Sequence, residues 1–165
     1  MMPFPGPFPR QFAASDAALW AAITKGWEGQ PFTLLTPGYV GVAFEFGRVI
    51  SSRNPAVSHG TIGEWSVLVW DGRLLLRDSS GKEQVLRGND EALAVCEPLY
   101  GQVLEQVVLR EPEMTLELRI GSHQFRIAGI EGSDSDIWHL VVGARWHVTA
   151  TVQGAWQVED ADPAS

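Results

Sequence analysis

The sequence is short of cysteine and lysine, with one cysteine and two lysines in 165 residues. Cys96 alone cannot form an internal disulfide or supply a multi-cysteine metal site. Long apolar runs are missing as well, and a helix that spans a bilayer needs about 20 apolar residues. Residues 1–10 lack the basic and apolar parts of a secretory signal. We therefore expect a cytoplasmic protein without a membrane partner.

The familiar signatures of catalysis are also missing from the chain. It contains no G-x-S-x-G nucleophile motif, no Walker-type phosphate loop, no H-E-x-x-H zinc motif and no glycine pattern for dinucleotides. Cys96 falls in a short apolar segment, where a packed thiol is more common than a nucleophile. The sequence therefore predicts a protein that is not an enzyme and that binds no cofactor.

The charge balance indicates which class of macromolecule the protein can bind. The formal net charge is -8 at pH 7, which opposes binding to a phosphate backbone, because such binding depends on Lys and Arg. We expect no nucleic-acid partner and favour a protein partner with a basic surface. The alternative is that the charge serves solubility alone. A homodimer through exposed strand edges stays open.

Hydrophobic residues make up 45% of the chain and charged residues 19%, which is typical of a globular protein. Residues 1–14 are rich in Pro and Phe and predict an extended arm. Residues 15–159 predict a single β-rich domain, and residues 160–165 an acidic tail. Within the domain we expect one helix over residues 16–25, capped by Ser15, and a second over residues 90–97, capped by Asn89. The scarcity of lysine beside plentiful Gly, Ala, Pro and Trp indicates a bacterial gene.

The clearest element is a β-hairpin over residues 113–127. Apolar and polar residues alternate on both sides of Gly121-Ser122, where a type II′ turn requires a positive φ at the glycine. This turn sets Leu118 opposite Phe125 and Glu117 opposite Arg126. A second hairpin is predicted over residues 65–78, with Asp71-Gly72 as its turn and a third strand at 83–86 completing a meander.

Further alternating segments predict strands over residues 39–46, 103–110, 137–142, 145–152 and 155–159. The predicted fold is mainly β, with an α+β class kept as the alternative. It consists of about ten short antiparallel strands in a sandwich or a partly open barrel, with one N-terminal helix and one short central helix.

Seven tryptophans are the most unusual feature of the composition. Most should fill the core, and Trp70 is the best surface candidate because it adjoins the predicted turn opposite Arg73, where a cation–π contact can form. The long loop at 53–63 adds Arg53 and His59 as candidate binding residues.

Three carboxylates that alternate with Gly and Ser between two predicted strands complete the binding set: Glu131, Asp134 and Asp136. Such a loop can hold a hard cation, but it lacks the glycine and the distal glutamate of an EF-hand, so a solvated turn is preferred.

The histidines at 123, 139 and 147 raise the question of a zinc site. If Gly143-Ala144 is a two-residue turn, His139 and His147 point to opposite faces of their hairpin and cannot share an ion. We therefore expect no metal. A slip of one residue in this register would reverse the argument.

Part of the chain resembles small β-rich bacterial proteins of unknown function, some of which are immunity proteins that neutralise a toxin. The pattern consists of Leu99-Tyr100-Gly101, Val103, Val107, Leu116-Glu117-Leu118, Phe125-Arg126-Ile127 and Ile137-Trp138. The resemblance implies a non-enzymatic protein-binding domain, with toxin neutralisation as its particular role. The alternative is a small-molecule or carbohydrate-binding sandwich or barrel with a Trp-lined surface, built on Trp70, Trp138, His147 and the loop around His59.

Overall fold

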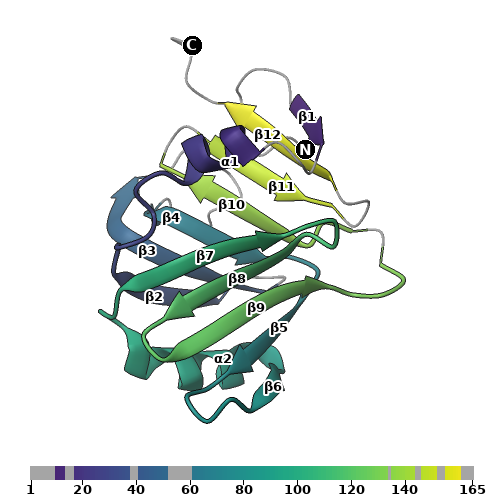
Figure 1. The fold of residues 1–165 in the computed structure, drawn as a ribbon. Coiled ribbons are helices and arrows are strands. Elements are labelled where there is room, and N and C mark those ends of the chain that lie inside the picture. The colour runs from purple at the N-terminus through teal and green to yellow at the C-terminus, as the bar shows by residue number, and fades with distance from the viewer. Residues whose placement is uncertain are drawn as a thin grey trace.

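A computed structural model describes residues 10–13, 17–37, 41–51, 61–133, 135–143, 146–151 and 155–160. Two antiparallel sheets pack face to face, with the five-stranded sheet in front of the larger one in Figure 1. The predicted mainly β class and the sandwich alternative are confirmed, as are the N-terminal and the central helix. No helix in the described part of the chain has the length and apolar character that crossing a membrane requires.

The larger sheet has seven strands. In the order in which they pair, they are β1 (Arg10–Ala13), β12 (Ala155–Asp160), β11 (Trp146–Ala150), β10 (Trp138–Val142), β4 (Thr61–Val69), β3 (Val42–Ser51) and β2 (Phe32–Pro37). Two of these strands were not predicted. The end of the expected arm forms β1 at the edge of the sheet, and β2 lies in a stretch whose prolines indicate a loop, since Pro is tolerated at edge strands.

The smaller sheet has five strands. In pairing order, they are β6 (Glu83–Leu86), β5 (Gly72–Arg77), β9 (His123–Gly129), β8 (Thr115–Ile120) and β7 (Leu104–Arg110). The predicted register of the β8–β9 hairpin is confirmed, with Leu118 paired to Phe125 and Glu117 to Arg126. Gly121 takes the positive φ that the turn requires, at +59°.

The predicted hairpin over residues 65–78 is wrong. β4 pairs with β3 and β10, whereas β5 pairs with β6 and β9, so the chain crosses from one sheet to the other at Trp70 and Asp71. The predicted pairing of residues 73–78 with 83–86 is confirmed as β5–β6. The predicted loop at 53–63 is also too long, because β4 already begins at Thr61.

Two helices close the ends of the sandwich (Figure 1). Helix α1 (Ala17–Thr24) buries Ile23 and packs the partly buried Trp20 against the core. Its predicted cap, Ser15, lies outside the described residues. Helix α2 (Gly88–Cys96) is followed by the short 3-10 helix η1 (Glu97–Leu99) and begins earlier than predicted. Arg87, not Asn89, occupies the N-cap position, and its N–H donates to the carboxylate of Glu91 at 3.2 Å.

The space between the sheets is filled by apolar side chains, most of the tryptophans among them. Trp27 and Trp138 are fully buried, while Trp20, Trp65 and Trp146 are partly buried against the same core. The indole N–H of Trp138 donates to the carbonyl of Met114 at 2.9 Å and so joins the two sheets. The expectation that most tryptophans are core residues is confirmed for those whose side chains the structure describes.

Candidate functional site

The site lies where the chain crosses between the two sheets. Trp70 and Asp71 carry the chain from β4 to β5, and residues 130–137 carry it back from β9 to β10. Backbone hydrogen bonds hold the two crossings together, from the N–H of Trp70 to the carbonyl of Ile137 at 3.0 Å and from Asp71 to Asp136 at 3.1 Å. The hydroxyl of Ser133 also donates to the carboxylate of Asp71. Residues distant in sequence therefore form one surface.

Trp70 provides the apolar part of this surface. Its ring lies against the imidazole of His139, with 5.1 Å between the ring centroids. The side chain is nevertheless 37% exposed, and Ile130 at the start of the other crossing is exposed to a similar degree. An exposed indole on a fixed backbone suits binding, because Trp combines a large apolar area with an N–H donor.

His139 and His147 face each other on the outer side of the seven-stranded sheet. The Nδ1 atom of His139 is 2.7 Å from Nε2 of His147 and 3.2 Å from the hydroxyl of Thr149. Val142 pairs with Trp146, so the turn has three residues and the predicted register is one residue off. The prediction that the two histidines occupy opposite faces is therefore wrong, because a one-residue slip exchanges the faces.

The contacts of the pair select one arrangement of protons. The carboxylate of Asp136 lies 3.3 Å from Nε2 of His139 and favours a proton on that nitrogen. Nδ1 of His139 then accepts the N–H from Nε2 of His147. Burial, with a smaller contribution from the charge of His139, lowers the pKa of His147 to about 3, although Asp136 acts in the opposite direction. His147 is therefore neutral near pH 7.

With His147 neutral, the formal charges of the described residues on the two crossings are those of carboxylates. Asp71, Glu131 and Asp136 lie on the two crossings, with Glu131 exposed and Asp136 partly exposed. In the part of the chain that the structure describes, no group of three or more His, Cys, Asp or Glu side chains could hold a metal ion. The two crossings therefore carry negative charge and an exposed indole, and a basic, partly apolar surface would complement them.

The candidate binding residues have different outcomes. Trp70 and Asp136 meet at this surface, and Glu131 belongs to the same crossing. Arg73 is exposed near the start of β5, but the cation–π contact with Trp70 across a hairpin is wrong because no such hairpin forms. Asp134, Arg53 and His59 lie outside the described residues.

The residues proposed for a Trp-lined ligand surface come together only in part. Trp138 points into the core, whereas His147 lies on the outer side of the same sheet. Trp70 is exposed beside His139. Trp70 and His147 therefore lie on either side of His139, whereas Trp138 is fully buried and is not part of that surface.

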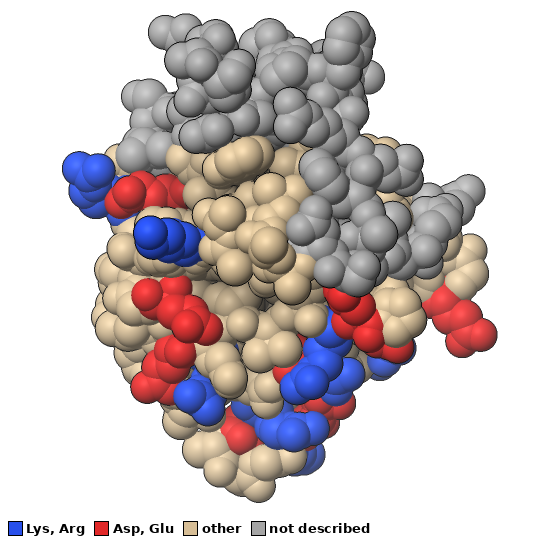
Figure 2. All heavy atoms as spheres, turned by 45° about the horizontal axis from the view of Figure 1, so that its top comes forward, with Lys and Arg blue, Asp and Glu red and all other residues tan. Residues whose placement is uncertain are grey.

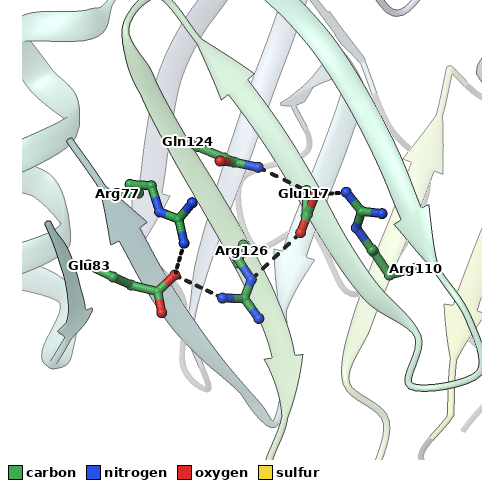
Figure 3. Close-up of polar contacts among 6 residues, drawn as sticks. All are labelled: Arg77, Glu83, Arg110, Glu117, Gln124 and Arg126. Carbon is green, nitrogen blue, oxygen red and sulfur yellow. Dashed lines mark hydrogen bonds and ion pairs between the residues drawn. The ribbon is translucent and has the colours of Figure 1, made fainter. Parts of the chain in front are cut away.

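A second polar cluster covers the outer side of the five-stranded sheet (Figure 3). Glu83 on β6 lies 2.8 Å from Nη1 of Arg126 and 3.8 Å from Nη2 of Arg77. Glu117 on β8 lies 3.7 Å from Nε of Arg126 and 3.1 Å from Nη2 of Arg110. The Glu117–Arg126 pair was predicted from the hairpin register, but its extension over all five strands depends on the pairing of β5 with β9, which no local pattern indicates. We call these five charged residues the charge ladder.

Comparison with protein-family models, with curated proteins and with solved structures finds no match to this chain.

Proposed function

We propose that the protein is a non-enzymatic protein-binding domain of the toxin-neutralising kind and that its partner presents a basic surface to Trp70. The observation that carries the proposal is the exposed Trp70 ring, held against His139 and accompanied by carboxylates on two joined chain crossings. The net charge of -8 adds long-range attraction for a basic protein. Nucleic acid and membranes are not its targets.

The rigidity of the surface supports this role. The two crossings share backbone hydrogen bonds, and the Trp70 ring contacts a histidine that is itself hydrogen-bonded. An anchor residue that is already fixed loses little conformational entropy on binding. Large, half-exposed aromatic side chains of this kind often account for much of the binding energy of an interface.

The test is capture of partners from the lysate of the native host at low and at moderate salt, with mass spectrometry of the retained proteins. The wild type is compared with Trp70→Ala and Asp136→Asn. Val103→Ala is the matched control, because Val103 is also an exposed apolar residue but belongs to another region of the surface. Circular dichroism confirms that each variant is folded.

We expect one basic protein that the wild type and Val103→Ala retain and that Trp70→Ala loses. Retention should weaken as salt rises, because screening shortens the range of the attraction. Co-expression of the captured protein and the wild type should then restore growth if the partner is a toxin. Capture of the same proteins by wild type and Trp70→Ala, or of none, would contradict the proposal.

A further inference from the structure

The outer side of the five-stranded sheet has the opposite charge to the protein as a whole. Five of the ten arginines of the chain have side chains on this side: Arg73, Arg77, Arg110, Arg119 and Arg126. Three strand carboxylates accompany them, those of Glu83, Glu105 and Glu117. The strand residues of this side therefore carry a net charge of +2 on a chain of net charge -8. Figure 2 shows several Lys and Arg low on the molecule, interspersed with Asp and Glu, and others at its upper left.

The charge ladder holds its arginines in place and leaves them accessible. Two glutamates are shared among three arginines, so the carboxylates do not saturate the guanidinium groups, each of which has five N–H donors. Arg77 and Arg110 remain 50% and 60% exposed at the two ends of the ladder. Their donors can therefore reach an incoming anion.

We infer that this side of the sheet binds an acidic segment of a partner protein, whose carboxylates contact Arg77, Arg126 and Arg110. A planar guanidinium that is already positioned recognises a carboxylate through two parallel hydrogen bonds. The arginines come from β5, β9 and β7, so they are spaced across the strands. An extended segment that crosses the strands meets them in turn.

The whole-molecule charge decides between an acidic protein segment and a nucleic acid. A polyphosphate backbone extends far beyond the ladder and is repelled by the acidic remainder of the surface. A short acidic segment interacts mainly within the Debye length of about 10 Å at 0.1 M salt, where the local arginines dominate. The inference does not depend on the function proposed for Trp70, because it concerns another surface.

The probe is a fluorescently labelled octapeptide of glutamate, whose binding to the full chain is followed by anisotropy at about 0.1 M salt, where the Debye length is about 10 Å. The test variant is Arg77→Gln with Arg126→Gln. The matched control is Arg48→Gln, because Arg48 is also exposed and also paired with a glutamate, Glu64, but belongs to the other sheet. A second variant, Arg77→Lys with Arg126→Lys, keeps the charge and removes the paired donors. Urea unfolding shows that each protein is folded.

We expect saturable binding that the double glutamine variant weakens at least tenfold, that the lysine variant weakens less, and that Arg48→Gln changes less than twofold. Trp70→Ala should bind the peptide like the wild type. Failure of this inference can therefore be distinguished from failure of the function proposed for Trp70. The inference is overturned by an equal loss with Arg48→Gln, by absence of saturable binding, or by tighter binding of an octamer of deoxythymidine. Sedimentation velocity then measures the oligomeric state. A wild-type dimer that becomes a monomer in the double glutamine variant would also overturn the inference, because the surface would then bind a second copy of the chain.

Discussion

His139 and His147 lie diagonally across β10 and β11, close enough for Nδ1 of one ring to accept the N–H of the other. The pair can share a single bridging proton, because two N–H groups that faced each other at 2.7 Å would repel. The neutral His147 therefore donates this hydrogen bond to His139, which lies against the exposed Trp70.

This arrangement predicts acid sensitivity. His147 has a pKa of about 3 in the folded protein, whereas in the unfolded chain the value returns to 6.5. Below pH 6.5 the unfolded chain binds more protons, so the stabilisation is complete above that pH and is lost as the pH falls towards 3. Urea unfolding should show a loss of about 2 kcal/mol between about pH 7.5 and about pH 5 from this residue. His147→Gln, which keeps an N–H donor but does not titrate, should remove this loss, while His123→Gln should retain it. Identical pH profiles for wild type and His147→Gln would contradict the assignment.

The charge ladder predicts unequal effects of removing its carboxylates. Glu117 is 11% exposed between Arg110 and Arg126, whereas Glu105 is half exposed beside Arg119. Glu117→Gln should lower the free energy of unfolding by about 1–2 kcal/mol, because it leaves two arginines around an uncharged group. Glu105→Gln should cost less than about 0.5 kcal/mol, as is usual for exposed pairs. Urea titration measures both, and equal losses would mean that burial does not distinguish the two pairs.

The hydrogen bond from Trp138 to Met114 predicts that replacing Trp138 destabilises the protein more than replacing the exposed Trp70. Trp138→Phe should lower the free energy of unfolding by about 2 kcal/mol, since it leaves a small cavity and a buried carbonyl without its donor. Trp70→Phe should change stability by less than about 0.5 kcal/mol, because the ring is partly exposed. Thermal unfolding compares the two, and similar values would refute the role of the bond between the sheets.

Cys96 should be inert in the folded protein. It is the last residue of α2 and is fully buried in the core, and burial raises the pKa of its thiol to about 12. Iodoacetamide at about pH 8 should leave the native protein unmodified and should alkylate it fully in concentrated urea, as mass spectrometry would show. Rapid alkylation without denaturant would mean that the thiol is accessible.

The accuracy of the sequence predictions follows the range of the interactions that determine each element. The β8–β9 register was correct to the residue, because a two-residue turn with glycine fixes it locally. The prediction of a β4–β5 hairpin was wrong, although both segments are strands and bury apolar residues. Val69 and Leu74 both belong to the core but lie in opposite sheets, and the pattern of buried residues is the same in either arrangement.

The candidate site was only partly predictable for the same reason. Trp70 and Asp136 were selected for separate reasons, and only the paired crossings bring them together. The histidine pair was missed because the turn at residue 143 has one more residue than assumed, which no local preference reveals. The charge ladder needed the order of all five strands, which is a property of tertiary structure.

The crossing at Trp70 and Asp71 has a consequence for how the chain folds. Val69 pairs with Trp138 in one sheet, and Gly72 pairs with Gly129 in the other. Residues that are close in sequence therefore pair with strands of different sheets, and both of those strands are synthesised much later. Pairings of such high contact order close slowly, because a long loop must lose its entropy first. The five-stranded sheet needs β9 and the seven-stranded sheet needs β10, β11 and β12, so neither sheet is complete until the second half of the chain has been made. The two layers should therefore assemble in one cooperative step, with the local β8–β9 hairpin as the natural nucleus.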